Sequence, residues 1–234
     1  MTTEQSLNSW RGVNAGQPLS HVNCLQFSAG YSVNCSMSTS TDLQSPAGRL
    51  KAETSGAHQR TEKALVSRIR AITGPPDYAS LLACLYGYFS PIEKAIDPVL
   101  SSLFPDYQKR RKSGRLLEDV RSLDANAVLR LANPLLQSAS AATALGYAYV
   151  MEGSVLGGAI IKKMISGRFP GIPDKSFSFF SGYGEDNRIM WNAFLDVLNR
   201  ELAPATQQQE GFDGANACFT GMEHWIEDWY SAEW

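Results

Sequence analysis

Apolar residues recur at helical spacing over most of the chain from Arg49 onward. Positions three and four residues apart along 50–69 form one apolar helix face, and the Gly-Pro-Pro sequence at 74–76 ends that helix. A second apolar helix is expected next, with Asp77 as its cap. Pro91 should kink it, because proline removes a backbone donor and crowds the preceding turn.

The second half of the chain predicts three further helices. The Asn-Pro pair at 133–134 is typical of a helix start and precedes an apolar run to Met164, softly broken at Gly153. Two prolines then indicate a loop, and helices are expected near 185–202 and 212–230. Strand signals are weak throughout. The prediction is therefore an all-α fold, with a single bundle-like domain of about six to eight helices.

The first 48 residues follow neither a helical nor an alternating pattern. They are rich in Ser, Asn, Gly and Thr, and their only charged residues are Glu4, Arg11 and Asp42. Such a composition rarely orders itself. We expect residues 1–48 to be a flexible leader before a helical domain of residues 49–234, with a partner-binding tail as the alternative.

Composition and charge exclude several functional classes. The 234 residues are 44% hydrophobic and 19% charged, with a net charge of −2. That charge gives no general attraction to nucleic acid or anionic membranes. No stretch reaches about 18 uncharged apolar residues, so no membrane span is expected. The four cysteines form no CxxC pair, which disfavours a structural zinc site. Without a secretory signal pattern, a cytoplasmic location is the default.

One histidine stands out among the three in the chain. His58 lies on or beside the apolar face of the first predicted helix, and Glu62 follows one turn later. Neutral imidazole is a good metal ligand when an acceptor fixes its other nitrogen, although a lone histidine is more often structural. A haem needs only one axial histidine. Lys51, two turns earlier on the same face, suits an anionic group, or is a solvated lysine.

The second unusual feature is a glycine-rich segment in an apolar run, Glu152–Gly158. Each of its three glycines costs about 0.8–1 kcal/mol relative to alanine in a helix. Two compensations remain open. Another helix packs closely against the glycines, or a flat ligand approaches a backbone that has no Cβ to hold it away.

Taken in order, several segments resemble the haem oxygenase family, most closely its bacterial biliverdin-producing branch, which includes enzymes associated with bacteriophytochromes. The resemblance covers about residues 50–226. It rests on LKAETSGAHQRTE at 50–62, YASLL at 78–82, YFSPIE at 88–93, GYAYVMEGSVLGG at 146–158, and the segments 180–194 and 217–226.

The resemblance implies a role for each matching residue. His58 would be the proximal ligand of the haem iron, Glu62 would hydrogen-bond the other ring nitrogen, and Lys51 would lie near a haem propionate. A kinked distal helix over the haem would be formed by Gly153, Ser154, Gly157 and Gly158. The walls of the pocket would be formed by Phe212 and Phe219.

The implied activity is conversion of haem, with O2 and external electrons, to biliverdin, Fe2+ and CO. The electrons would come from a ferredoxin, flavodoxin or similar reductant, docked on Lys162, Lys163 and Arg168 unless these only solvate a helix end. A bilin-accepting photoreceptor is a further expected partner. Ser154 stands where many members have aspartate, which leaves a non-catalytic haem- or bilin-binding relative as the alternative. A thiaminase-like or metal-dependent oxidase and a structural interaction module are weaker ones.

Overall fold

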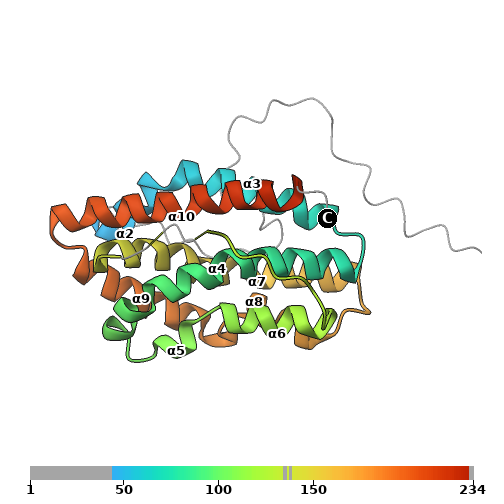
Figure 1. Ribbon diagram of the computed structural model, residues 1–234. Helices are drawn as coiled ribbons and strands as arrows, with labels where there is room; N and C mark the ends of the chain where they lie inside the picture. Colours follow the sequence, from blue (N-terminus) through green and yellow to red (C-terminus); the bar gives the residue numbers. More distant parts are fainter. Residues whose placement is uncertain (1–43, 134–135, 137–138, 232–234) are drawn as a thin grey trace, which may run out of the picture. The chain divides into compact units, whose positions relative to one another are not determined.

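The computed structural model describes residues 44–133, 136 and 139–231, and within these ranges it contains helices and no strand (Figure 1). The α-helices are α2 (Pro46–Glu53), α3 (Ser55–Ala71), α4 (Pro75–Leu103), α5 (Tyr107–Arg110), α6 (Ser113–Leu123), α7 (Ala141–Arg168), α8 (Ser178–Ser181), α9 (Asn187–Glu201) and α10 (Ala205–Ser231). Short 3-10 turns lie at Asp174–Phe177 and Gly184–Asp186. The predicted all-α class is confirmed.

The long helix α10 organises the domain, because it packs along α7 and along α3. Glycines allow the α7–α10 contact to be close. A Cβ on Gly146 of α7 would lie 2.1 Å from the carbonyl oxygen of Gly211 on α10, and one on Gly214 would lie 2.8 Å from the carbonyl oxygen of Thr143. Helix α7 carries the predicted distal glycines, α10 carries Phe212 and Phe219, and α3, which also packs on α10, carries His58.

The beginning of the helical region differs from the prediction in two details. Helix α2 begins at Pro46, inside the expected leader, and the Ser45 hydroxyl caps it by accepting from the Gly48 N–H at 3.0 Å. Residues 1–43 lie outside the described part. Gly74 rather than Asp77 caps α4, and the Asp77 carboxylate reaches back to accept from the N–H of Thr73 at 2.7 Å.

The interior of the chain also departs from local signals. Helix α4 runs through both Pro91 and Pro98. Helix α7 begins at Ala141, where the Ser140 hydroxyl accepts from the Thr143 N–H at 3.1 Å. The predicted start at Asn133 is wrong, because residues 136, 139 and 140 are not helical and the N-cap is Ser140. Pro134 lies outside the described residues. Helix α7 also continues through Gly153 without a break.

Helix α7 is long and apolar enough to cross a membrane by length and composition. Half of its most apolar window is nevertheless buried inside the protein, against α10, α8 and α9. Helices of this kind are common in protein cores, so packing accounts for the hydropathy of the buried half of this window.

Candidate functional site

The imidazole of His58 lies on α3 and packs against an aromatic ring of α10. Its ring centroid is 5.1 Å from that of Phe219, with the planes tilted by 43°. Its Nε2 is 3.3 Å from Oε1 of Glu62, and the two side chains are 40% and 45% exposed. A pair this exposed adds little stability. The structure nevertheless brings His58, Glu62 and Phe219 together, as the resemblance implied.

Helix α3 is held in register on α10 by polar contacts from two residues that lie between His58 and Glu62 in the sequence. The Thr61 hydroxyl donates to the carbonyl of Phe219 at 2.9 Å, and Arg60 lies 3.1 Å from Glu223. The buried Thr61 bond is the stronger constraint, because its acceptor is the backbone of the residue under the imidazole. The position of His58 relative to Phe219 is therefore set by the backbones of two helices.

Lys51 is not on the helix that carries His58. It is exposed on α2, and Thr54, whose hydroxyl donates to the carbonyl of Leu50 at 2.7 Å, separates α2 from α3. The single helix on which both side chains were expected is therefore divided at Thr54. Contact of Lys51 with a propionate stays a prediction.

The glycine-rich segment of α7 separates into two kinds of position. A Cβ on Gly158 would lie 2.2 Å from the carbonyl oxygen of Phe180 in α8, so this glycine permits close backbone packing. A Cβ on Gly157 would meet nothing within 4 Å, and a Cβ on Gly153 would touch Trp191 at an ordinary 3.8 Å. The close packing considered from the sequence is thus present at Gly158, while approach of a flat ligand at Gly157, where space is open, stays a prediction.

The side of α7 that carries Gly157 is apolar and open. Leu156 and Ile160 flank Gly157 and are 48% and 39% exposed. The Ser154 hydroxyl donates to the carbonyl of Met151 at 2.7 Å, one turn back along the same helix. This open face of α7 (Leu156, Gly157 and Ile160) therefore offers backbone and aliphatic surface, and no acid.

The floor between the two helices comes from α10. Phe212 and Phe219 are seven residues apart, two turns along the same side of α10, and both are buried. Helices α3 and α7 also meet at their C-terminal ends. There Arg168, the last residue of α7, donates to the carbonyls of Ile69 at 3.4 Å and Ile72 at 2.8 Å.

These contacts change the predicted docking patch. Arg168 holds the end of α3, and Lys162 is 3.3 Å from the hydroxyl of Ser181. Lys163 remains exposed. Arg168 and Lys162 therefore have a structural role in addition to any role in binding a partner.

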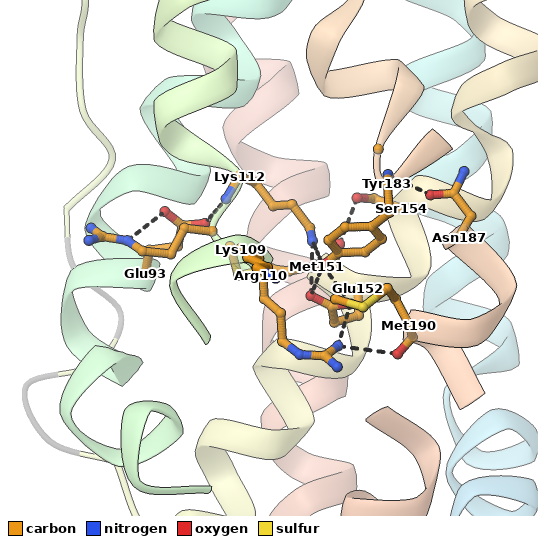
Figure 2. Close-up of polar contacts among 12 residues, drawn as sticks. Glu93, Lys109, Arg110, Lys112, Met151, Glu152, Ser154, Tyr183, Asn187 and Met190 are labelled. Carbon is orange, nitrogen blue, oxygen red and sulfur yellow. Dashed lines mark hydrogen bonds and ion pairs between the residues drawn. The ribbon is translucent and has the colours of Figure 1, made fainter. Parts of the chain in front are cut away.

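A buried charged cluster on another side of α7 was not predicted from the sequence (Figure 2). Its centre is the carboxylate of Glu152, which contacts Arg110, Lys112 and Tyr183. Burial lowers the pKa of Lys112, an effect that Glu152 opposes, and burial raises the pKa of the Tyr183 hydroxyl. The available signal was Glu152 itself, because a charge inside an apolar helix needs a partner.

Two hollows lie away from His58. One of about 20 Å³, enough for a single water, is lined by the cluster residues Arg110 and Glu152 together with Glu93 and Tyr107. A larger groove of about 380 Å³ lies between the start of α4 and Trp229 of α10.

Comparison with known proteins gives one consistent result. The family model described as Heme oxygenase matches residues 44–228. The heme oxygenase of Xanthomonas campestris pv. campestris (strain 8004) is 31% identical over 143 residues, which cover 61% of this chain and 84% of that protein.

Solved structures share the fold. Heme oxygenase 2 from Chlamydomonas reinhardtii without heme has a TM-score of 0.65 at 20% identity, covering 79% of this chain and 97% of its own. Heme oxygenase-1 from Synechocystis sp. PCC6803 in complex with heme has a TM-score of 0.63 at 18% identity, covering 79% and 91%. The NO- and CO-bound heme oxygenase of Neisseria meningitidis also scores 0.63, at 20% identity, covering 81% and 94%.

Proposed function

Since the chain belongs to the haem oxygenase family and is a haem-degrading oxidoreductase, we propose that it opens haem between α3 and α7 with His58 as the proximal ligand of the iron. O2 and electrons from an external donor are the co-substrates, and biliverdin, Fe2+ and CO are the products. The observation that carries the assignment of the site is the half-exposed imidazole of His58, backed by Phe219 and oriented by Glu62.

The proximal side has the properties that an axial ligand needs. The imidazole has an accessible edge, and the two helices that position it are fixed to each other by the Thr61 bond. A carboxylate beside a ligating histidine fixes its tautomer and raises its basicity. His224, by comparison, is exposed on α10. His58 is therefore the better ligand of the two histidines in the described part of the chain.

The distal side has the properties that ring opening needs. The open face of α7 lets a flat porphyrin approach the backbone at Gly157, because no Cβ intervenes. The face carries no carboxylate or imidazole that would donate a proton directly to bound oxygen. Ser154 bonds to its own helix, and the carboxylate of Glu152 is buried. Proton supply then falls to water, and the close helix directs the oxygen toward the porphyrin edge.

The sequence Glu-Gly-Ser at 152–154 supports placing the chain in the bacterial biliverdin-producing branch, including enzymes that supply bacteriophytochromes. A bilin-accepting photoreceptor is part of this proposal, as is a cytoplasmic location. For the electron donor, exposed Lys163 at the end of α7 favours an acidic ferredoxin or flavodoxin. The negative charge of such a donor would meet a helix end that Lys162 and Arg168 also make positive.

Haem turnover by the purified chain tests the proposal. One equivalent of hemin should give a Soret band, and a reductant in air should then replace it with the broad red absorption of a bilin. A His58→Ala variant should lose the normal ferric spectrum, while the His224→Ala control should keep it. A stable Soret band under several donors would instead show a non-catalytic haem-binding relative, and no Soret shift would refute the haem site.

A further inference from the structure

The buried cluster around Glu152 joins two segments of the chain, at 110–112 and at Tyr183, to one turn of α7 (Figure 2). Oε1 of Glu152 accepts from Nζ of Lys112 at 2.9 Å and from the hydroxyl of Tyr183 at 2.8 Å. Oε2 accepts from Nη1 of Arg110 at 3.3 Å. The side chains of Lys112, Arg110 and Glu152 are only 1%, 4% and 6% exposed. Such complete burial makes each of these bonds costly to leave unmade.

Each partner is itself held in place. The backbone N–H of Lys112 donates to the buried carboxylate of Glu93 on α4. The backbone N–H of Tyr183 donates to Oδ1 of Asn187 at 2.7 Å. Gly182, with φ of +59°, makes the turn that aims Tyr183, and a Cβ there would lie 2.9 Å from Cβ of Val155 on α7. The donors therefore form a rigid frame around the carboxylate.

Stability does not account for this arrangement. A buried ion pair is often no more stabilising than well-packed apolar residues of the same volume, because desolvation opposes the attraction. Directional bonds from two segments instead give the group that they hold a unique position. The adjoining turns of α7 need such a device, because Gly153 and Gly157 lack side chains that interlock with neighbours.

Glu152 cannot act on the substrate by contact. At about 100° per residue, its side chain leaves α7 about 140° around the helix from Gly157. Its carboxylate is also enclosed by Arg110, Lys112 and Tyr183. Any influence on the reaction must therefore pass through the helix backbone.

We propose that Glu152 is a positioning residue, and that Lys112 and Tyr183 act through it to fix the rotation and height of the α7 turns that face the haem. This inference rests on the proposed function, in which the open face of α7 is a wall of the haem site. It adds a residue set that governs how well the bound substrate is cleaved, separately from how tightly it is bound. A misplacement of about 1 Å in a reacting geometry can cost on the order of 100-fold in rate.

The test replaces the cluster with apolar groups, in the variant Lys112→Met/Glu152→Leu/Tyr183→Phe. Arg110 keeps Asp106, 2.9 Å from its Nε, as a partner. We expect this variant to fold and to bind hemin with the wild-type Soret band and an affinity within about threefold. Turnover should fall by about 10- to 100-fold, and more reductant should be consumed per haem cleaved. The ratio of reductant to biliverdin is a readout that loss of stability alone does not move.

A matched control and a milder variant make the result specific. Tyr78→Phe also removes a buried tyrosine hydroxyl bond, 2.8 Å to the carbonyl of Ser176, but not one to α7. Its ratio of reductant to biliverdin should stay at the wild-type value, while Tyr183→Phe should raise that ratio.

Three outcomes would overturn the inference while leaving the proposed function intact: wild-type turnover in the triple variant, equal ratios in Tyr183→Phe and Tyr78→Phe, or failure of the triple variant to fold. Absence of a His58-dependent haem spectrum in the wild-type chain would refute the proposed function, and this inference with it.

Discussion

Two neighbouring glycines of α7 should respond in opposite ways to alanine. A Cβ on Gly157 would meet nothing within 4 Å, whereas one on Gly158 would lie 2.2 Å from the carbonyl oxygen of Phe180 and 3.0 Å from its carbonyl carbon. The clash at Gly158 involves backbone, which cannot turn aside as a long side chain can. The variants Gly157→Ala and Gly158→Ala therefore form a matched pair in one helical turn.

The expected magnitudes follow from these contacts. Alanine is favoured over glycine inside a helix by about 0.8–1 kcal/mol, so Gly157→Ala should raise the free energy of unfolding of the haem-free protein by up to that amount. Overpacking costs about 1–3 kcal/mol, and contact with backbone places Gly158→Ala at the upper end, for a net loss of about 2 kcal/mol. For a domain of this size the two variants should differ in Tm by about 6–12 °C.

The substitution Gly157→Ala, which should stabilise the haem-free protein, should impair the interaction with haem. If the porphyrin approaches the backbone there, the added methyl group of Gly157→Ala occupies the contact. Hemin binding or turnover should then weaken by about 10-fold despite the higher Tm. Urea or thermal unfolding without haem, followed by hemin titration of the same samples, measures both effects.

The Tm values and the haem measurements test two separate features of α7. Equal Tm values for the two variants would contradict the close packing of α7 on α8. Wild-type haem binding and turnover in Gly157→Ala would contradict the placement of the substrate against the open face of α7.

Three further predictions concern other parts of the domain. Arg168→Gln removes the bonds to the carbonyls at the end of α3, so hemin should transfer faster to a scavenger protein in stopped-flow mixing. An unchanged transfer rate would show that the ends of α3 and α7 do not govern the access of hemin to its site. Burial raises the pKa of the Cys84 thiol to about 12 and also raises that of Cys218, so iodoacetamide at pH 8 should leave both unmodified in peptide mapping, and rapid labelling would contradict their burial. Hydrogen bonds from the hydroxyl and the N–H of Thr73 hold the pKa of Asp77 below its ordinary value of 3.8, so its contribution to stability is present above that pH and is lost as the pH falls through the folded-state pKa. Asp77→Asn should therefore lower Tm at pH 7 and not at pH 2, and equal losses at both would refute the assignment.

The helices that the sequence predicted best are those with an apolar face and clear ends. The segment now seen as α9 has these properties and lies close to its predicted range of 185–202, whereas the helix predicted over 50–69 is divided at Thr54 into α2 and α3. The start of α7 was mispredicted, because the local signal at Asn133 competes with Ser140, whose hydroxyl makes the actual cap. Helix α6 was missed, since it is short and rich in charged residues. Local signals thus placed the long helices and failed where two equivalent caps compete.

In the candidate site, too, contacts between residues close in the sequence could be predicted and contacts between distant residues could not. His58 and Glu62 are one turn apart, so their contact followed from spacing alone. Phe219 came only from the family resemblance. The partners of Glu152 could not be predicted, because Lys112 and Tyr183 are 40 and 31 residues away in the sequence and meet it only through tertiary packing.

The assignment of His58 as the iron ligand is tested most directly by resonance Raman spectroscopy of the ferrous haem complex. An iron–histidine stretching band should appear in the wild-type chain and in His224→Ala. The band should be absent in His58→Ala and return when imidazole is added to that variant. Its persistence in His58→Ala without imidazole would contradict the proposed site, because another residue would then hold the iron.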